Sequence, residues 1–140
     1  MSRVWILALA TALGAAGDAC RPGEEGEPAT PAAYGERFTL GLGESAEVDG
    51  DYRIRFARVS EDSRCPEAVE CAHAGNAAVA FAVESPRGSA TLTLHTDRAP
   101  RSVAAMGGEV ALVDLLPRPV AGTVPDTAEY RATLVVEEAP

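Results

Sequence analysis

Three cysteines and two histidines are the side chains of this 140-residue sequence with the broadest chemistry. Cys71 and His73 stand two positions apart, a spacing that would place both on one face of a strand. With Cys65, His95 or Met106 they would make a soft-metal set for copper or zinc. These residues are spread through the chain, however, and a disulfide would leave no thiolate for a metal. We therefore expect no metal or cofactor, with copper or zinc binding through Cys71 and His73 as the alternative.

Signatures of common catalytic sites are absent from the sequence. It contains no G-x-S-x-G, H-E-x-x-H, P-loop or dinucleotide-binding pattern. All 12 basic residues are arginine, so a lysine nucleophile or Schiff base is excluded. Glu47, Asp49 and Asp51 surround an Asp-Gly pair and are interpreted as a solvated hairpin tip. We expect a protein that is not an enzyme, with an unrecognised hydrolase as a second alternative.

The charge balance argues against nucleic acid as a partner. The sequence has 21 acidic and 12 basic residues, a formal net charge of −9. Phosphate backbones are bound by clustered cationic side chains, and no such cluster is present.

Residues 1–19 have the pattern of a signal peptide. Arg3 provides a short positive region, and the apolar run from Val4 to Ala16 is too short to cross a bilayer. Gly17-Asp18-Ala19-Cys20 resembles a bacterial lipobox, in which the cysteine is lipidated and becomes the new N-terminus. Gly17 and Asp18 differ from the residues that this motif prefers, and ordinary signal-peptidase cleavage is the alternative.

Cys20 is therefore expected to carry a lipid that anchors the chain to a membrane of the bacterial cell envelope. The residue after Cys20 is Arg21 rather than Asp. By resemblance to Gram-negative lipoproteins, this residue favours the outer membrane. A soluble periplasmic or secreted protein is the alternative. Residues 20–36 are rich in Pro, Gly and Glu and are expected to form a flexible acidic tether.

From Phe38 onward the dominant hydrophobic period is two, which is typical of strands with one buried face. The turn signals Asp49-Gly50 and Ser85-Pro86-Arg87-Gly88 separate neighbouring runs. Apolar residues on both faces of 109–116 indicate a central or bulged strand. About seven strands are predicted, at 38–42, 46–48, 52–56, 77–83, 90–94, 109–116 and 130–136. Residues 37–140 are thus expected to form one all-β domain, an immunoglobulin-like antiparallel β-sandwich, or alternatively a small Greek-key barrel.

The connection between the third and fourth predicted strands carries a distinctive motif. It reads D-S-R-C-P-x-x-V-x-C-x-x-A-G-x-A, from Asp62 to Ala77. This resembles a family of small, uncharacterised bacterial secreted proteins and lipoproteins, although many members have an aromatic residue where His73 stands. The resemblance implies an exported β-sandwich with a disulfide-closed loop, and it implies no activity.

A Cys65–Cys71 disulfide is also what an oxidising compartment favours. The closed loop is short, so the chain-entropy gain is about 2 kcal/mol. Asp62 and Arg64 are expected to bond loop backbone groups or each other. The connection is then either a structural clip or a partner-binding loop formed by Asp62, Arg64, Glu67, Glu70 and His73.

Together these patterns predict a lipid-anchored envelope protein that acts as a binding or structural module. The sequence does not identify the partner.

Overall fold

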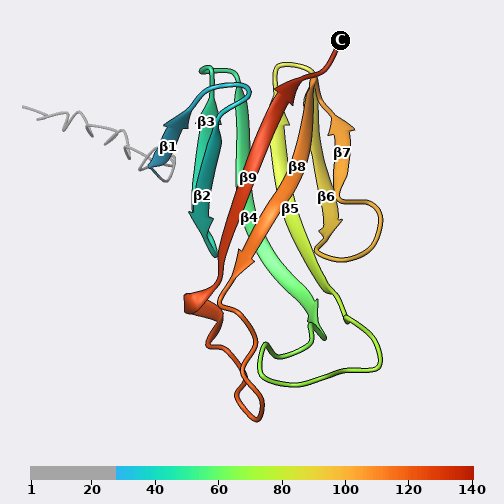
Figure 1. The fold of residues 1–140 in the computed structure, drawn as a ribbon. Helices are drawn as coiled ribbons and strands as arrows, with labels where there is room; N and C mark the ends of the chain where they lie inside the picture. Colours follow the sequence, from blue (N-terminus) through green and yellow to red (C-terminus); the bar gives the residue numbers. More distant parts are fainter. Residues whose placement is uncertain (1–27) are drawn as a thin grey trace, which may run out of the picture.

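The computed structural model describes residues 28–140, which form two β-sheets packed face to face (Figure 1). The five-stranded sheet has the order β1-β3-β4-β5-β6, with bounds β1 Ala29–Ala32, β3 Ser45–Val48, β4 Tyr52–Asp62, β5 Ala77–Ser85 and β6 Gly88–His95. The four-stranded sheet has the order β2-β9-β8-β7, with bounds β2 Arg37–Gly41, β9 Arg131–Glu138, β8 Gly108–Leu116 and β7 Ser102–Ala105. A short 3-10 helix, η1 (Thr127–Glu129), precedes β9.

The predicted β-sandwich is confirmed, and the barrel alternative is wrong because each sheet ends in free edge strands. Alternating apolar residues of both sheets face one shared core, as the period of two requires. Its largest fully buried side chains include Tyr52, Phe56 and Phe81, and the rings of Phe56 and Phe81 lie 5.4 Å apart.

Strands β3 to β6 follow one another in a single sheet, and β7 to β9 follow one another in the other. The immunoglobulin order instead distributes the strands as ABED and CFG, with more crossings between the sheets. The sandwich architecture is thus shared, while the order of the strands is the chain's own.

Two strands lie outside the predicted set. β1 falls within the predicted tether, so the expectation of a flexible segment is wrong for residues 29–36. β1 pairs in parallel with β3, and the Asp49 side chain at the next hairpin accepts a hydrogen bond of 2.9 Å from the backbone N–H of Tyr34. β7 has four residues, and its three apolar residues, Val103 to Ala105, follow one another without alternation.

The prediction of a central or bulged strand at 109–116 is confirmed on both counts. β8 lies between β9 and β7, and its register against β9 shifts between Leu112 and Asp114. The shift turns both Leu112 and Leu115 into the core, where they are 4% and 1% exposed. Just beyond this bulge β8 ends and the proline-rich connection begins.

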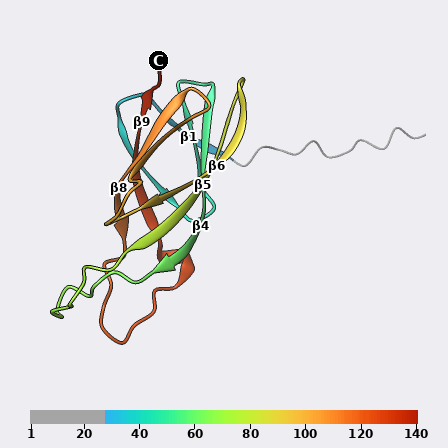
Figure 2. The ribbon, with the colours of Figure 1, turned by 90° about the vertical axis from the view of Figure 1, so that its right-hand side faces the viewer.

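Two long connections protrude from one end of the sandwich, opposite the C-terminus (Figures 1 and 2). One joins β4 to β5 and contains the cysteine motif, and we call residues 63–76 the cysteine loop. The other joins β8 to β9 and includes η1, and we call residues 117–130 the proline loop. Within residues 28–140 no helix is long and apolar enough to cross a membrane.

Candidate binding site at the loop end

The cysteine loop is closed by the expected Cys65–Cys71 disulfide, with a Cα–Cα distance of 6.0 Å. Its two arms continue the pairing of β4 with β5, because Ser63 N–H donates to Asn76 C=O and Cys65 N–H donates to Ala74 C=O, at 2.8 and 2.9 Å. The crossing of the arms is tight: Gly75 has a φ of +72°, and a Cβ there would overlap the carbonyl oxygen of Ser63. Only glycine fits this position.

Arg64 connects the cysteine loop to the other sheet. Its Nε and Nη2 donate to the two carboxylate oxygens of Asp62 at 2.8 and 2.7 Å. Nη1 donates to Leu115 C=O at 2.6 Å and Nη2 donates to Pro117 C=O at 2.9 Å. Tyr130 completes the network by donating its hydroxyl to Asp62 Oδ2 at 2.9 Å. The end of β4, the end of β8 and the start of β9 are therefore held by one carboxylate and one guanidinium.

This network is largely shielded from water. The Arg64 and Asp62 side chains are only 7% and 14% exposed. Burial by itself raises the pKa of Asp62, but hydrogen bonds from Arg64 and Tyr130 outweigh it and hold the pKa below its ordinary value. Burial and the hydrogen bond to Asp62 raise the pKa of Tyr130 to about 12. The carboxylate is thus ionised and the phenol neutral at physiological pH.

The proline loop packs directly against the cysteine loop. Glu67 N–H donates to Pro119 C=O at 3.4 Å, and the Glu67 carboxylate lies 3.9 Å from Arg118. Arg118 also forms an ion pair of 2.9 Å with Asp114. At its far end the proline loop re-enters the sheet through η1, which begins with a capping box between Asp126 and Glu129. The two loops form one continuous, internally braced surface.

A hollow of about 260 Å³ lies between the two loops. It is lined by Asp62, Arg64 and Tyr130, together with Pro66 and residues 119–125. We call it the inter-loop hollow.

Large apolar side chains that are exposed in residues 28–140 gather around this end of the molecule. They are Val69, Leu116, Val120 and Val124, with exposed fractions of 44%, 43%, 63% and 91%. Each lies on one of the two loops or on the last residue of β8. The remainder of the described surface shows no exposed side chain of this size and class.

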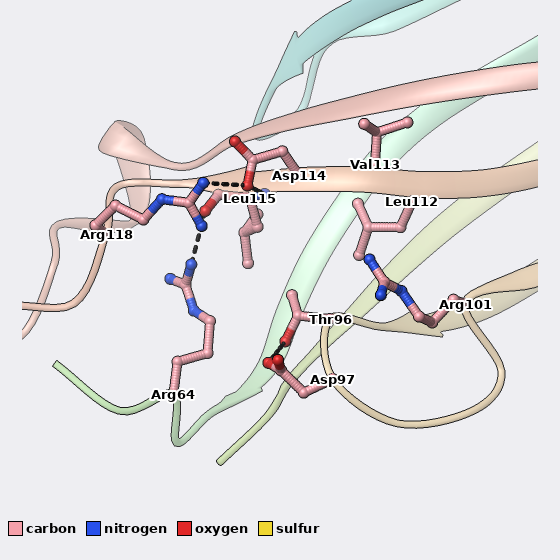
Figure 3. Close-up of a pocket in the computed structure, with 9 residues that line it drawn as sticks. All are labelled: Arg64, Thr96, Asp97, Arg101, Leu112, Val113, Asp114, Leu115 and Arg118. Carbon is pink, nitrogen blue, oxygen red and sulfur yellow. Dashed lines mark hydrogen bonds and ion pairs between the residues drawn. The ribbon is translucent and has the colours of Figure 1, made fainter. Parts of the chain in front are cut away.

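A second hollow, of about 270 Å³, also has Arg64 in its lining (Figure 3). It is lined by three arginines, two aspartates and a threonine, together with residues of β8: Arg64, Arg101, Arg118, Asp97, Asp114, Thr96, Leu112, Val113 and Leu115. Arg118 and Asp114 pair across its wall, and Arg64 is bound to Leu115 C=O. For the hydrolase alternative, this hollow offers carboxylates and a hydroxyl, without histidine or cysteine among its lining residues.

The predicted partner-binding residues divide into two groups. Asp62 and Arg64 pair with each other, which was one of the two expected contacts, and the carbonyl groups that Arg64 binds belong to β8 and the proline loop. Glu67, Glu70 and His73 are exposed on the cysteine loop.

The expectation that Cys71 and His73 share one face of a strand is wrong, because residues 71–73 lie outside the strands. Cys71 is also oxidised in the disulfide, so it offers no thiolate. Across residues 28–140 no group of three or more His, Cys, Asp or Glu side chains is arranged to hold a metal ion. His95 instead lies 3.0 Å from the side-chain amide of the buried Asn76, which supports the start of β5.

The sequence did not indicate which distant groups bind the motif. These groups are the hydroxyl of Tyr130 and the carbonyl groups of Leu115 and Pro117. Alternation correctly predicted that Tyr130 faces inward, where it is 6% exposed. Its hydroxyl partner lies 68 positions away, and no local spacing indicates such a contact.

Comparison with known protein families, with curated proteins and with solved structures finds no match for this chain. The predicted signal peptide, the lipidation of Cys20 and the beginning of the tether lie outside the described residues.

Proposed function

We propose that this chain is an exported, lipid-anchored protein of the bacterial cell envelope that binds a protein partner through its loop end. The signal-peptide and lipobox patterns of residues 1–20 support export and anchoring. The observation that carries the binding role is the exposure of Val69, Leu116, Val120 and Val124 at the loop end, where Val120 and Val124 line the inter-loop hollow. Exposed apolar side chains with polar surroundings are typical of protein-binding surfaces.

The bracing matters because binding is weakened when loops must become ordered on contact. Here the disulfide, the Asp62–Arg64–Tyr130 network and the capping box hold both loops before any partner arrives. An apolar side chain of the partner would occupy the inter-loop hollow.

Exposed acidic side chains are present on both loops, at Glu67, Glu70, Asp126 and Glu129, and outnumber the one exposed arginine there, Arg118. We therefore infer a partner surface with an apolar centre and a basic rim, because opposite charges at the rim speed encounter and exclude like-charged proteins.

Site-specific photo-crosslinking in the producing cell tests the binding role. A photoreactive residue at position 124 should capture a discrete partner, whereas one at position 86, on the exposed β5–β6 turn at the opposite end, should not. Binding of that partner should be lost with Val120→Asp and kept with Val120→Ile, since the side chain is exposed and neither change disturbs the core. Equal capture at both positions, or none at position 124, overturns the proposal.

The intact mass of the exported protein tests the anchor separately. Cleavage before Cys20 with acyl chains on that residue is expected, and reduction should add the mass of two hydrogens for the one disulfide. A chain that begins at Cys20 without lipid would show a soluble exported protein, and an uncleaved chain would contradict export.

A further inference from the structure

The outer edge of β6 has hydrogen-bonding groups that no described strand uses. β6 is the last strand of its sheet and pairs only with β5. The N–H of His95 points away from β5, because it donates to Pro100 C=O at 2.9 Å, while the next N–H, of Thr96, donates to Ala77 C=O beside β5. Alternate residues of a strand direct their backbone groups to the same edge. The N–H and C=O groups of Ser89, Thr91 and Thr93 therefore point outward.

Other edge strands in residues 28–140 carry features that oppose pairing with a further strand. β1 has four residues and includes Pro31, which has no N–H to donate. β7 also has four residues and is preceded by Arg101. β2 begins with Arg37 and ends at Gly41. β6 is eight residues long and contains no proline and no acidic or arginine side chain, so it lacks the usual protection of an edge.

We propose that β6 pairs with β6 of a second copy of this chain, in antiparallel orientation, to form one sheet that continues across a two-fold homodimer. When Thr91 lies opposite Thr91 of the second copy, Ser89 of each copy lies opposite Thr93 of the other. Every outward N–H and C=O of these three residues then has a partner. Ser89, Thr91 and Thr93 are exposed on the outer face, where Thr–Thr and Ser–Thr neighbours across strands are favourable.

Charge favours a second copy as the occupant of this edge. The protein is acidic overall, but the strand itself brings no like charges together. The two-fold arrangement also places Arg87, at the start of one strand, beside the end of the other strand, which Asp97 follows. Arg87 would then approach Asp97 at both ends of the contact, while the neighbouring Arg98 is paired with Glu61.

Sedimentation equilibrium of the full chain carrying Cys20→Ser, with its disulfide intact, tests the proposal. A concentration-dependent dimer is expected. Thr91→Lys should weaken it at least about tenfold, because two like charges face each other at the centre of the pairing. The matched variant Thr91→Val should dimerise as the parent does, since the contact uses the backbone and a β-branched side chain suits a strand.

The register has its own test. The double variant Ser89→Glu/Thr93→Lys places opposite charges face to face across the two-fold and should remain dimeric. Far-UV circular dichroism checks that each variant is folded. A parent chain that is monomeric over the whole concentration range, a dimer unaffected by Thr91→Lys, or an edge that binds only a foreign strand overturns the proposal.

Discussion

At the scale of single residues, the molecule depends on how Arg64 satisfies several acceptors from one position. Four donor contacts connect its guanidinium to Asp62 and to the carbonyl groups of Leu115 and Pro117. The planar, multi-donor geometry of arginine suits this task, and a lysine could not reproduce it. The charge of Arg64 thus stabilises the structure, while the charged side chains of Glu67 and Glu70 on the same loop are exposed.

Arg64→Met should destabilise the fold by about 3 kcal/mol, because it leaves the shielded Asp62 carboxylate without its cation and two carbonyl groups without a donor. Urea unfolding measures the change. Arg118→Met is the matched control, since its ion pair with Asp114 joins side chains that are 51% and 34% exposed, and a loss below about 1 kcal/mol is expected. Equal effects of the two substitutions would contradict the structural role assigned to Arg64.

The same network makes the free energy of unfolding depend on pH in the acidic range. The pKa of Asp62 is lower in the folded than in the unfolded chain, so its carboxylate stabilises the fold fully above about pH 4. This contribution is lost as the pH falls through the folded pKa. Tyr130→Phe removes one donor and should bring that pKa closer to its ordinary value, which flattens the decline. Tyr52→Phe removes a hydroxyl remote from Asp62 and should leave the acid profile of the unfolding free energy unchanged.

At the scale of elements, the two long connections are as well determined as the strands that they join. The cysteine loop keeps strand-like pairing at its base and a disulfide at its tip. The proline loop rests on it through the contacts of Glu67 with Pro119 and Arg118. Long connections with this much internal bonding are expected to keep a fixed shape.

Gly75→Ala should destabilise the fold by about 3 kcal/mol or more, because the new methyl group overlaps the Ser63 carbonyl and the φ of +72° disfavours any side chain. Gly122→Ala in the proline loop is a close control. Gly122 has a φ of +75°, and a methyl group added there would meet no atom within 4 Å, so only the conformational part, about 1 kcal/mol, should be lost. Thermal unfolding measures the stability of both variants. Equal losses of stability would show that the chain relieves the overlap at Gly75 at no cost in stability.

Sequence patterns predicted the sandwich because most of its strands show a period of two. They missed β7, whose apolar residues do not alternate, and β1, whose proline and small residues are typical of a tether. For the loop end, the oxidising compartment and the family resemblance predicted the disulfide, and the pairing of Asp62 with Arg64 was one of the two contacts expected for these residues. The contacts of Arg64 with Leu115 and Pro117 did not, since they join positions more than fifty apart and are created by the fold.

At the scale of the whole molecule, a tyrosine hydroxyl joins the two sheets at each end of the sandwich. Tyr130 at the loop end donates to Asp62, the last residue of β4. Tyr52, at the start of β4, donates to the carbonyl of Ala105 in β7 at 3.1 Å. Burial raises the pKa of both phenols to about 12, with additional contributions from Asp62 at Tyr130 and from Tyr34 at Tyr52.

The fold should therefore lose stability in alkali. A raised pKa means that the neutral phenol stabilises the folded state, fully below the unfolded pKa of about 10, and that the contribution is lost as the pH rises through about 12. The variant Tyr52→Phe/Tyr130→Phe should show a flatter decline over this interval in urea titrations. A decline as steep as that of the parent would place the titrating groups elsewhere.

The parallel pairing of β1 with β3 also sets how far the domain can stand from a membrane. Since β1 begins at Ala29, the chain between a lipid on Cys20 and this strand cannot span more than about 30 Å, whatever its conformation. A tether extending to residue 36 would have allowed nearly twice that length. Under the proposed anchoring, the loop end samples only a thin layer beside the bilayer, which raises the effective concentration of partners in the same membrane and disfavours distant ones.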